Sequence, residues 1–244
     1  GRGAADRPLA FDASSLAIRW SPDLTDGDLC VRLAGYRESR QSGLAGAASR
    51  AEGLSASVTW TGMSLPGLDA ARDWRLQVWA RSSDFANSSV AVGPGRASTT
   101  PASEQFATPA LGLGVNAALR GDWRGGGWEL GADVRYAEGE TREHFRYMAG
   151  AFTRGRVAGG AQSVAGVYGE AWWYGRNSLS VTGGLRLDRW ASFDGKRLER
   201  DLATGLPTLT LHPADADGLQ PTARLGVRKD YGTRFLRAAG YAGF

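Results

Sequence analysis

The sequence predicts an all-β protein, an antiparallel meander of about ten strands. Three observations support this fold class. Apolar residues alternate with polar ones at a period of two rather than 3.6. Short and long connections alternate along the chain, and tryptophans gather beside the short ones. Glycine, at 35 of 244 residues, lies inside the alternating segments as well as between them, which argues against a flexible linker.

Ten alternating segments follow one another along the chain. In the clearest one, Leu111, Leu113 and Val115 alternate with glycine and asparagine. Successive side chains of a strand point to opposite faces, so each segment has one apolar face. In chain order the segments are Leu16 to Trp20, Leu29 to Leu33, Leu54 to Trp60, Trp74 to Ala80, Ala110 to Trp123, Trp128 to Tyr136, Ala165 to Trp173, Leu179 to Leu187, Ala223 to Val227 and, more weakly, Leu236 to Ala242.

The two faces differ in charge. We call each set of alternate residues, whose side chains share one face, a phase. The apolar phase has no charged residue and includes many alanines and glycines, whereas the buried face of a soluble sandwich is packed with large branched residues. The opposite phase is rich in charge. Its charged residues are Arg19, Arg32, Arg75, Arg81, Arg120, Glu129, Asp133, Arg135, Glu170, Arg186, Asp188, Arg224, Arg228 and Arg237.

The connections alternate strictly in length. The shorter ones are 21–27, 61–73, 124–127, 174–178 and 230–234, and the long polar ones are 37–52, 82–109, 137–163 and 189–220. Short and long connections therefore lie at opposite ends of the strands. Transmembrane β-barrels have this asymmetry, with short periplasmic turns and longer extracellular loops.

Aromatic residues mark the short-turn ends, which is typical of rings placed at the depth of lipid headgroups. They are Trp20, Trp60, Trp74, Trp123, Trp128, Trp173 and Tyr174, with Tyr36, Tyr136 and Trp190 more loosely at the other ends. No apolar run approaches the roughly 18 residues of a membrane-spanning helix. In hydrocarbon every backbone polar group must be paired, so strands can span only as a closed barrel. The pattern predicts strands of a transmembrane β-barrel.

Several function classes lack support in the sequence. Cys30 is the only cysteine, and His144 and His212 have no spaced partners for a metal, so we expect no metal site. No nucleophile elbow, ordered triad or phosphate loop is present, so we expect no enzyme and no cofactor. The net charge of +4 is mild and the arginines are dispersed, so we expect no nucleic-acid partner.

Four stretches resemble the barrel of TonB-dependent receptors. They are Gly166 to Trp173, Leu179 to Trp190, Pro221 to Arg228, and Leu236 to Phe244. The resemblance is weaker in the N-terminal half. The plug domain and energy-coupling box of that family are missing, and the chain stops inside a family motif. We therefore expect residues 1–244 to be part of a TonB-dependent receptor barrel, a curved sheet with unpaired end strands and its charged phase on the concave side.

The resemblance implies energy-coupled uptake of a scarce ligand across the bacterial outer membrane, such as a siderophore-iron complex, cobalamin or a glycan. The implied partners are outer-membrane lipid, a small-molecule ligand at the extracellular loops, and TonB through parts absent here. A passive porin-like barrel and, less strongly supported, a secreted soluble β binding protein are the alternatives. Lumen-facing candidates for ligand contact are Arg75, Arg81, Glu129, Asp133, Arg135, Glu170, Arg186, Asp188, Arg224 and Arg228.

Overall fold

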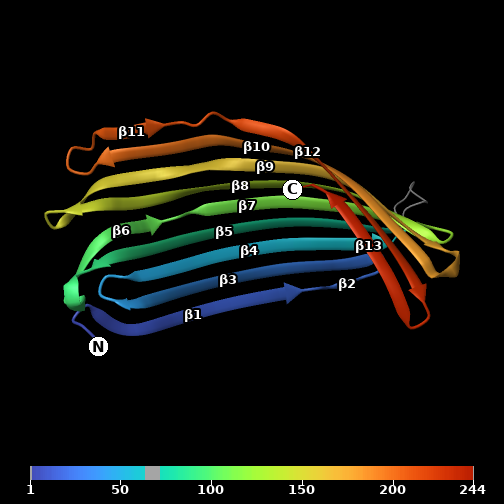
Figure 1. Cartoon of the computed structure of the whole chain (residues 1–244), viewed down its shortest axis with the longest axis horizontal. Helices are drawn as coiled ribbons and strands as arrows, with labels where there is room; N and C mark the ends of the chain where they lie inside the picture. The colour runs from blue at the N-terminus through green and yellow to red at the C-terminus, as the bar shows by residue number, and fades with distance from the viewer. Residues whose placement is uncertain (1, 64–71, 244) are drawn as a thin grey trace.

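The computed structural model describes residues 2–63 and 72–243 and contains one curved antiparallel sheet (Figure 1). Part of the predicted connection 61–73, and Phe244 of the C-terminal motif, lie outside the described residues. The elements are β1 (Asp6–Trp20), β2 (Asp23–Leu24), β3 (Gly27–Leu44), β4 (Ala48–Met63), β5 (Asp73–Val92), η1 (Pro94–Arg96), β6 (Thr99–Ala107), β7 (Ala110–Trp123), β8 (Gly126–Met148), β9 (Ala151–Gly175), η2 (Arg176–Ser178), β10 (Leu179–Asp201), β11 (Pro207–Leu211), β12 (Ala216–Tyr231) and β13 (Arg234–Ala242).

The ten predicted segments are confirmed as ten strands in a meander. Each of β1, β3, β4, β5, β7, β8, β9, β10, β12 and β13 contains one segment, and each pairs antiparallel with the next of these ten. The short strands β2, β6 and β11 are additions at the strand ends. Strand β6 precedes β7 and lies end to end with it. It pairs with the parts of β5 and β8 that extend past the start of β7. The prediction missed these three strands.

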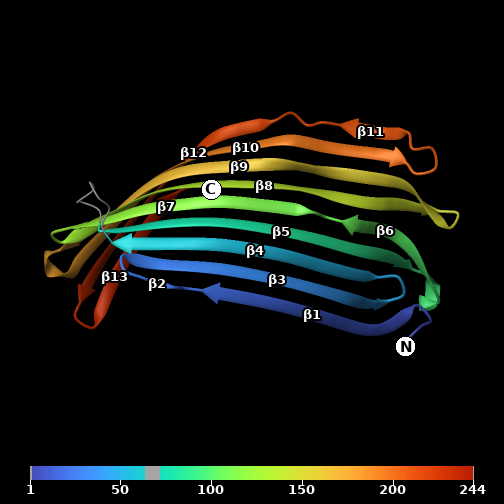
Figure 2. The ribbon, with the colours of Figure 1, turned by 180° about the vertical axis from the view of Figure 1, so that it is seen from behind.

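Strands β1 and β13 are the two edges of the sheet, and within residues 2–63 and 72–243 they do not pair with each other. This agrees with the expected open sheet. The hairpin of β12 and β13 curls in front of the wall in Figure 1 and lies behind it in Figure 2. The face turned toward the viewer of Figure 1 is therefore the concave one.

The sheet has no second layer and almost no core. Among the described residues the buried apolar side chains are four alanines, Ala5, Ala47, Ala118 and Ala161. The accessible surface is 16596 Å² for 25.9 kDa. A soluble monomer of this mass would expose about 10,500 Å². The described residues include no helix of the length and apolarity that crossing a membrane requires.

Exposure is reversed relative to a soluble protein. On the uncharged phase, Leu185 is 70% and Val167 is 59% exposed. On the charged phase, the side chains of Asp133 and Asp188 are only 12% and 18% exposed. An apolar surface of this extent requires contact with an apolar environment. About nine residues per strand make the uncharged run, which at a tilt of about 40° spans close to the ~25 Å band of an outer-membrane barrel.

The long connections are not loops, which corrects the prediction for 37–52, 82–109, 137–163 and 189–220. Strands β8, β9 and β10 have 23, 25 and 23 residues and pair along nearly their whole length. Beyond the uncharged run both faces of these hairpins carry charged side chains, Glu140 and Lys196 on one face and Glu143 and Arg156 on the other, so the apolar alternation that identifies a strand is lost. Paired backbone and ion pairs between strands maintain the sheet there.

Proteolysis will accordingly be confined to the tips of the hairpins. We expect limited proteinase K digestion of the detergent-solubilised protein to cut in 93–98, 149–150 and 202–206, where strand pairing is interrupted. The arms that β8 and β9 form over 137–163 will resist, because their backbone groups are paired. Mass spectrometry of the fragments identifies the cut sites. Early cuts inside 137–146 would show that the arms are mobile loops.

Candidate functional site

The charged phase forms a continuous polar surface on one face of the sheet. A row of directly opposed residues crosses the strands at mid-height: Thr59, Gln77, Asn116, Asp133, Gly166 and Asp188. Gln77 Nε2 donates to Thr59 Oγ1 at 3.2 Å, and Asn116 Nδ2 donates to Gln77 Oε1 at 3.2 Å. These hydrogen bonds between neighbouring strands fix the register of the polar face.

Arg186 is the centre of the polar surface. Its Nη2 lies 2.7 Å from Asp133 Oδ2, and its Nε donates to Asp188 Oδ2 at 2.8 Å. Asp133 lies on β8 and Arg186 on β10, so the guanidinium reaches across β9, where Gly166 leaves the necessary space. Side chains converge in this way on the inner side of a curved sheet. The expected placement of the charged phase on the concave side agrees with this geometry.

A second row of charge lies nearer the short turns. Glu129 of β8 accepts a hydrogen bond from the Tyr168 hydroxyl at 2.6 Å, and Arg224 of β12 forms an ion pair with Glu170 of β9. Arg75 belongs to the same lower region, opposite Thr61 and Ala118. Arg228 lies two residues before Asp230, its partner at 2.8 Å, close to the turn between β12 and β13.

Five of the ten predicted candidates, Arg75, Glu129, Glu170, Arg224 and Arg228, thus lie in the half of the wall toward the short turns. Asp133, Arg186 and Asp188 form the central cluster, and Arg81 and Arg135 lie further toward the long arms.

Arg81 and Arg135, the two candidates on the side of the arms, have little or no neutralisation by carboxylates. Arg135 is 54% exposed, and its one contact with a carboxylate, to Asp133, is long at 3.6 Å. Arg81 is exposed and has no ion pair among the described residues. These two guanidinium groups remain able to bind an anionic group.

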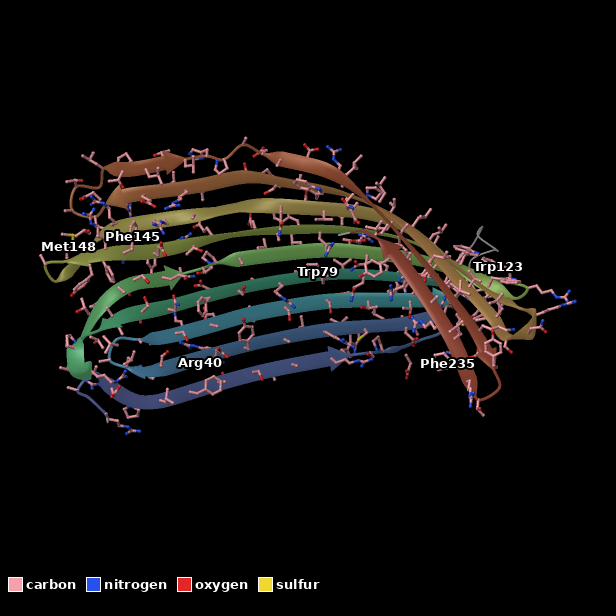
Figure 3. The ribbon with its side chains drawn as sticks, viewed as in Figure 1. Arg40, Trp79, Trp123, Phe145, Met148 and Phe235 are labelled. Atoms are coloured by element: carbon pink, nitrogen blue, oxygen red, sulfur yellow. The ribbon has the colours of Figure 1, made fainter. Side chains whose placement is uncertain are left out.

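Two tryptophans on the same phase were missed as site residues. Trp79 lies opposite Gly114, and Trp190 lies opposite Gly218. A Cβ on Gly114 would approach the Trp79 ring to 2.4 Å, so the indole lies flat against β7. Figure 3 shows Trp79 near the middle of the wall, between Phe145 at one end and Trp123 at the other. The parity of Trp79, which matches Arg75 and Arg81, is the signal in the sequence that could have identified it.

The aromatic residues at the short turns divide between the faces. The six predicted tryptophans Trp20, Trp60, Trp74, Trp123, Trp128 and Trp173 belong to the uncharged phase, and Trp60 and Trp74 stack edge to face with centroids 4.8 Å apart. Tyr174 lies opposite Ser180 on the charged phase and does not extend this row. Of the seven aromatic residues predicted at the short-turn ends, the six tryptophans therefore share the uncharged phase and Tyr174 does not.

A second ion-pair cluster joins the long arms. Arg156 of β9 lies between Glu143 of β8 at 2.5 Å and Glu199 of β10 at 2.7 Å, with its guanidinium 4.3 Å from the Phe145 ring centroid. Arg154 pairs with Asp201. This cluster explains why segments without apolar alternation remain strands.

At the far end of the arms, Asp6 fixes the η1 turn to the start of β1. The Asp6 carboxylate accepts hydrogen bonds from Arg96 Nε at 3.0 Å and from the Gly3 N–H at 2.6 Å. The hydrogen bond from Arg96 and then that from Gly3 lower the pKa of Asp6 from 3.8 to about 2. A lowered carboxylate pKa means that this contact is complete above about pH 4 and is lost as the pH falls through about 2.

We therefore expect a pulsed EPR distance between spin labels at Ala4 and Gly95 to stay narrow down to pH 3 and to broaden at pH 2. Asp6→Asn should broaden it at neutral pH. A distribution that is unchanged in both cases would contradict the role of this contact.

The two histidines lie apart. His144 is on β8, 3.3 Å from Glu104 Oε2 of β6, with its ring 4.6 Å from that of Phe106. His212 follows β11 and is exposed. Among residues 2–63 and 72–243 no group of three or more His, Cys, Asp or Glu side chains could hold a metal ion.

No protein-family model matches this sequence, and neither does any curated protein. Solved structures share its architecture, and three of them follow. The copper transporter OprC matches at 17% identity with a TM-score of 0.73, over 95% of this chain and 37% of that one. The ferric yersiniabactin uptake receptor FyuA from Yersinia pestis matches at 11% identity with a TM-score of 0.66, over 91% of this chain and 35% of that one. The ferric-catecholate import receptor Fiu from E. coli K12 matches at 12% identity with a TM-score of 0.68, over 97% of this chain and 48% of that one.

The chain thus spans between about a third and a half of the length of each solved structure. At these identities the match concerns the fold. The chain has the fold of a stretch of the barrel in the TonB-dependent receptors to which these three proteins belong.

Proposed function

We propose that residues 1–244 form part of the barrel wall of a TonB-dependent receptor that takes up a scarce ligand across the bacterial outer membrane. Candidate ligands are a siderophore-iron complex, cobalamin or a glycan. The observation that supports this proposal most is the reversal of exposure, with Leu185 70% exposed on one phase and Asp133 12% exposed on the other. Further strands of the parent protein would pair with β1 and β13, because an open edge is costly in lipid.

The ligand would contact the charged phase on the side of the long arms. Arg81, Arg135 and the flat indole of Trp79 are groups of this surface that a ligand can contact. The two arginines would pair with anionic groups of the ligand, and the indole would pack against an apolar or planar part. TonB would act through parts of the parent protein outside this chain.

Uptake by cells that make the full-length protein tests this proposal. We expect ligand uptake to require TonB and the proton-motive force. Arg81→Ala and Arg135→Ala should each raise the half-saturating ligand concentration about tenfold, the effect of losing one charge-assisted contact. Arg228→Ala is the matched control, since Arg228 lies at the short-turn end beside Asp230. Uptake that is independent of TonB would instead support a passive porin.

A further inference from the structure

Two neighbouring rows of residues on the concave face combine arginines with tryptophans and contain no acidic residue. The first row lies one step nearer the arms than the row through Asp133. Its members, each opposite the next across neighbouring strands, are Arg19, Arg32, Ser57, Trp79, Gly114, Arg135, Val164, Trp190 and Gly218. The second row, the next toward the arms, is Ala17, Ala34, Ser55, Arg81, Gly112, Ala137, Gln162, Ser192 and Ala216. We call these two rows the arginine–tryptophan band.

The four arginines of the band leave it positively charged. Arg19, Arg32 and Arg81 are exposed and have no ion pair within residues 2–63 and 72–243. Arg135 has only its long contact of 3.6 Å with Asp133. Guanidinium groups that recur across the strands without carboxylates between them favour a ligand that carries several anionic groups.

The two tryptophans of the band present flat ring faces. A Cβ on Gly114 would lie 2.4 Å from the Trp79 ring, and one on Gly112 would lie 3.3 Å from it. A Cβ on Gly218 would lie 3.0 Å from the Trp190 ring, which is 38% exposed. Because one face of each indole lies against glycine backbone, the other face is turned away from the wall. The electron-rich face of an indole attracts the polarised C–H groups of a ring stacked on it.

The spacing of the two indoles requires an extended ligand. Trp79 on β5 and Trp190 on β10 are separated by four strand spacings, or about 19 Å along the sheet. Arg135 lies midway between them in the same row. A compact ligand would stack on one indole only. A chain of sugar rings laid across the strands would place ring faces on both indoles and carboxylates beside the arginines.

The uncharged polar side chains of the band also match a sugar. They supply hydroxyl and amide groups that can donate to and accept from the hydroxyl groups of sugar rings. These residues are Ser55, Ser57, Gln162 and Ser192, and Gln162 and Ser192 are exposed beside Trp190. This chemistry favours a glycan over a nucleic-acid strand, which has anionic groups and ring faces but few hydroxyl groups.

We propose that the arginine–tryptophan band binds an acidic oligosaccharide, a chain of sugar rings that carry carboxylates. The ring faces stack on Trp79 and Trp190, and the carboxylates pair with Arg32, Arg81 and Arg135. The inference rests on the proposed function and deepens it, because it selects one ligand class for the concave surface.

Isothermal titration calorimetry of the full-length receptor in detergent tests this inference. Hexagalacturonate and hexamannuronate are the acidic probes, and maltohexaose is the neutral probe with the same number of rings. We expect at least one acidic probe to bind at least tenfold more tightly than maltohexaose, and its affinity to fall as salt is added. Arg32→Gln should raise the Kd for that probe about tenfold, and Trp79→Ala or Trp190→Ala about fivefold. Trp79→Phe should restore most of the affinity, because it keeps a ring face.

The matched controls lie on the same face outside the band. Trp172→Ala removes an indole that covers Gly127 near the short turns, and Arg237→Gln removes an exposed arginine from β13. Both should bind the acidic probe like the wild type. Equal losses in controls and test variants, equal affinity for acidic and neutral probes, or tighter binding of hexathymidylate would overturn the inference.

The proposed function fails separately from this inference. TonB-dependent uptake of a ferric siderophore by a receptor that binds neither acidic probe would overturn this inference alone. Failure of the full-length protein to fractionate with the outer membrane would contradict the proposed function.

Discussion

Leu185→Arg will lower the stability of the barrel in lipid by about 2 to 4 kcal/mol, the penalty for a cation near the bilayer midplane on the lipid-facing side of a strand. Leu185 lies near the middle of the uncharged run of β10 and is 70% exposed. In a soluble protein an arginine at so exposed a position would cost little. The sign and size of this effect therefore depend on what surrounds the uncharged phase.

The comparison requires a neighbour on the opposite phase. Thr182→Arg on β10 points to the polar surface and should cost less than about 1 kcal/mol. Asn116→Arg on β7 points to the same surface and should cost about 1 kcal/mol more than Thr182→Arg, because it also removes the hydrogen bond from Asn116 to Gln77. Val115→Arg, beside Asn116, should behave like Leu185→Arg. Folding of the full-length protein into lipid vesicles along a urea gradient measures all four variants. Equal costs on both phases would refute the assignment of the uncharged phase to the lipid-facing side.

Arg186→Gln should destabilise the protein by about 3 kcal/mol, the typical result of removing one partner from a largely buried ion cluster. The substitution leaves Asp133 and Asp188, whose side chains are 12% and 18% exposed, without the guanidinium between them. Their mutual repulsion adds to the cost. Arg228→Gln is the control, because Arg228 is 52% exposed and has Asp230 as its one ion-pair partner among the described residues. Its cost should stay below about 1 kcal/mol.

Adding Asp133→Asn to Arg186→Gln should recover part of the lost stability, since one carboxylate is then removed. The same urea titration measures this double variant. A loss equal to that of Arg228→Gln, or a double variant less stable than Arg186→Gln, would show that Arg186 does not neutralise these carboxylates.

The sequence predicts the ten main strands because the two faces of the sheet impose opposite demands on successive residues. Leu185, Arg186 and Leu187 show the alternation directly. The alternation does not reveal the arms, because neither of their faces must be apolar. Glu143, Arg156 and Glu199 pair with one another on one of these faces.

Charge alone also could not rank the site candidates. Arg186 and Arg135 look equivalent in the sequence. The structure separates them, because Arg186 is engaged by two aspartates while Arg135 is 54% exposed with one long contact. That difference depends on Gly166, which allows Arg186 to cross β9 and reach Asp133. Contacts across an intervening strand follow from register and curvature, which a single strand does not encode.

The environment of neighbouring side chains in lipid tests most directly whether one phase faces lipid and the other the lumen. Single cysteines at Val134 and Leu185, and at Asn116 and Thr182, introduced with Cys30→Ser, can be labelled with a fluorophore in the full-length protein. Brominated acyl chains should quench the first pair strongly and the second pair weakly, and aqueous iodide should do the reverse. Equal quenching of both pairs by brominated lipid would contradict the claim that one phase faces lipid and the other the lumen.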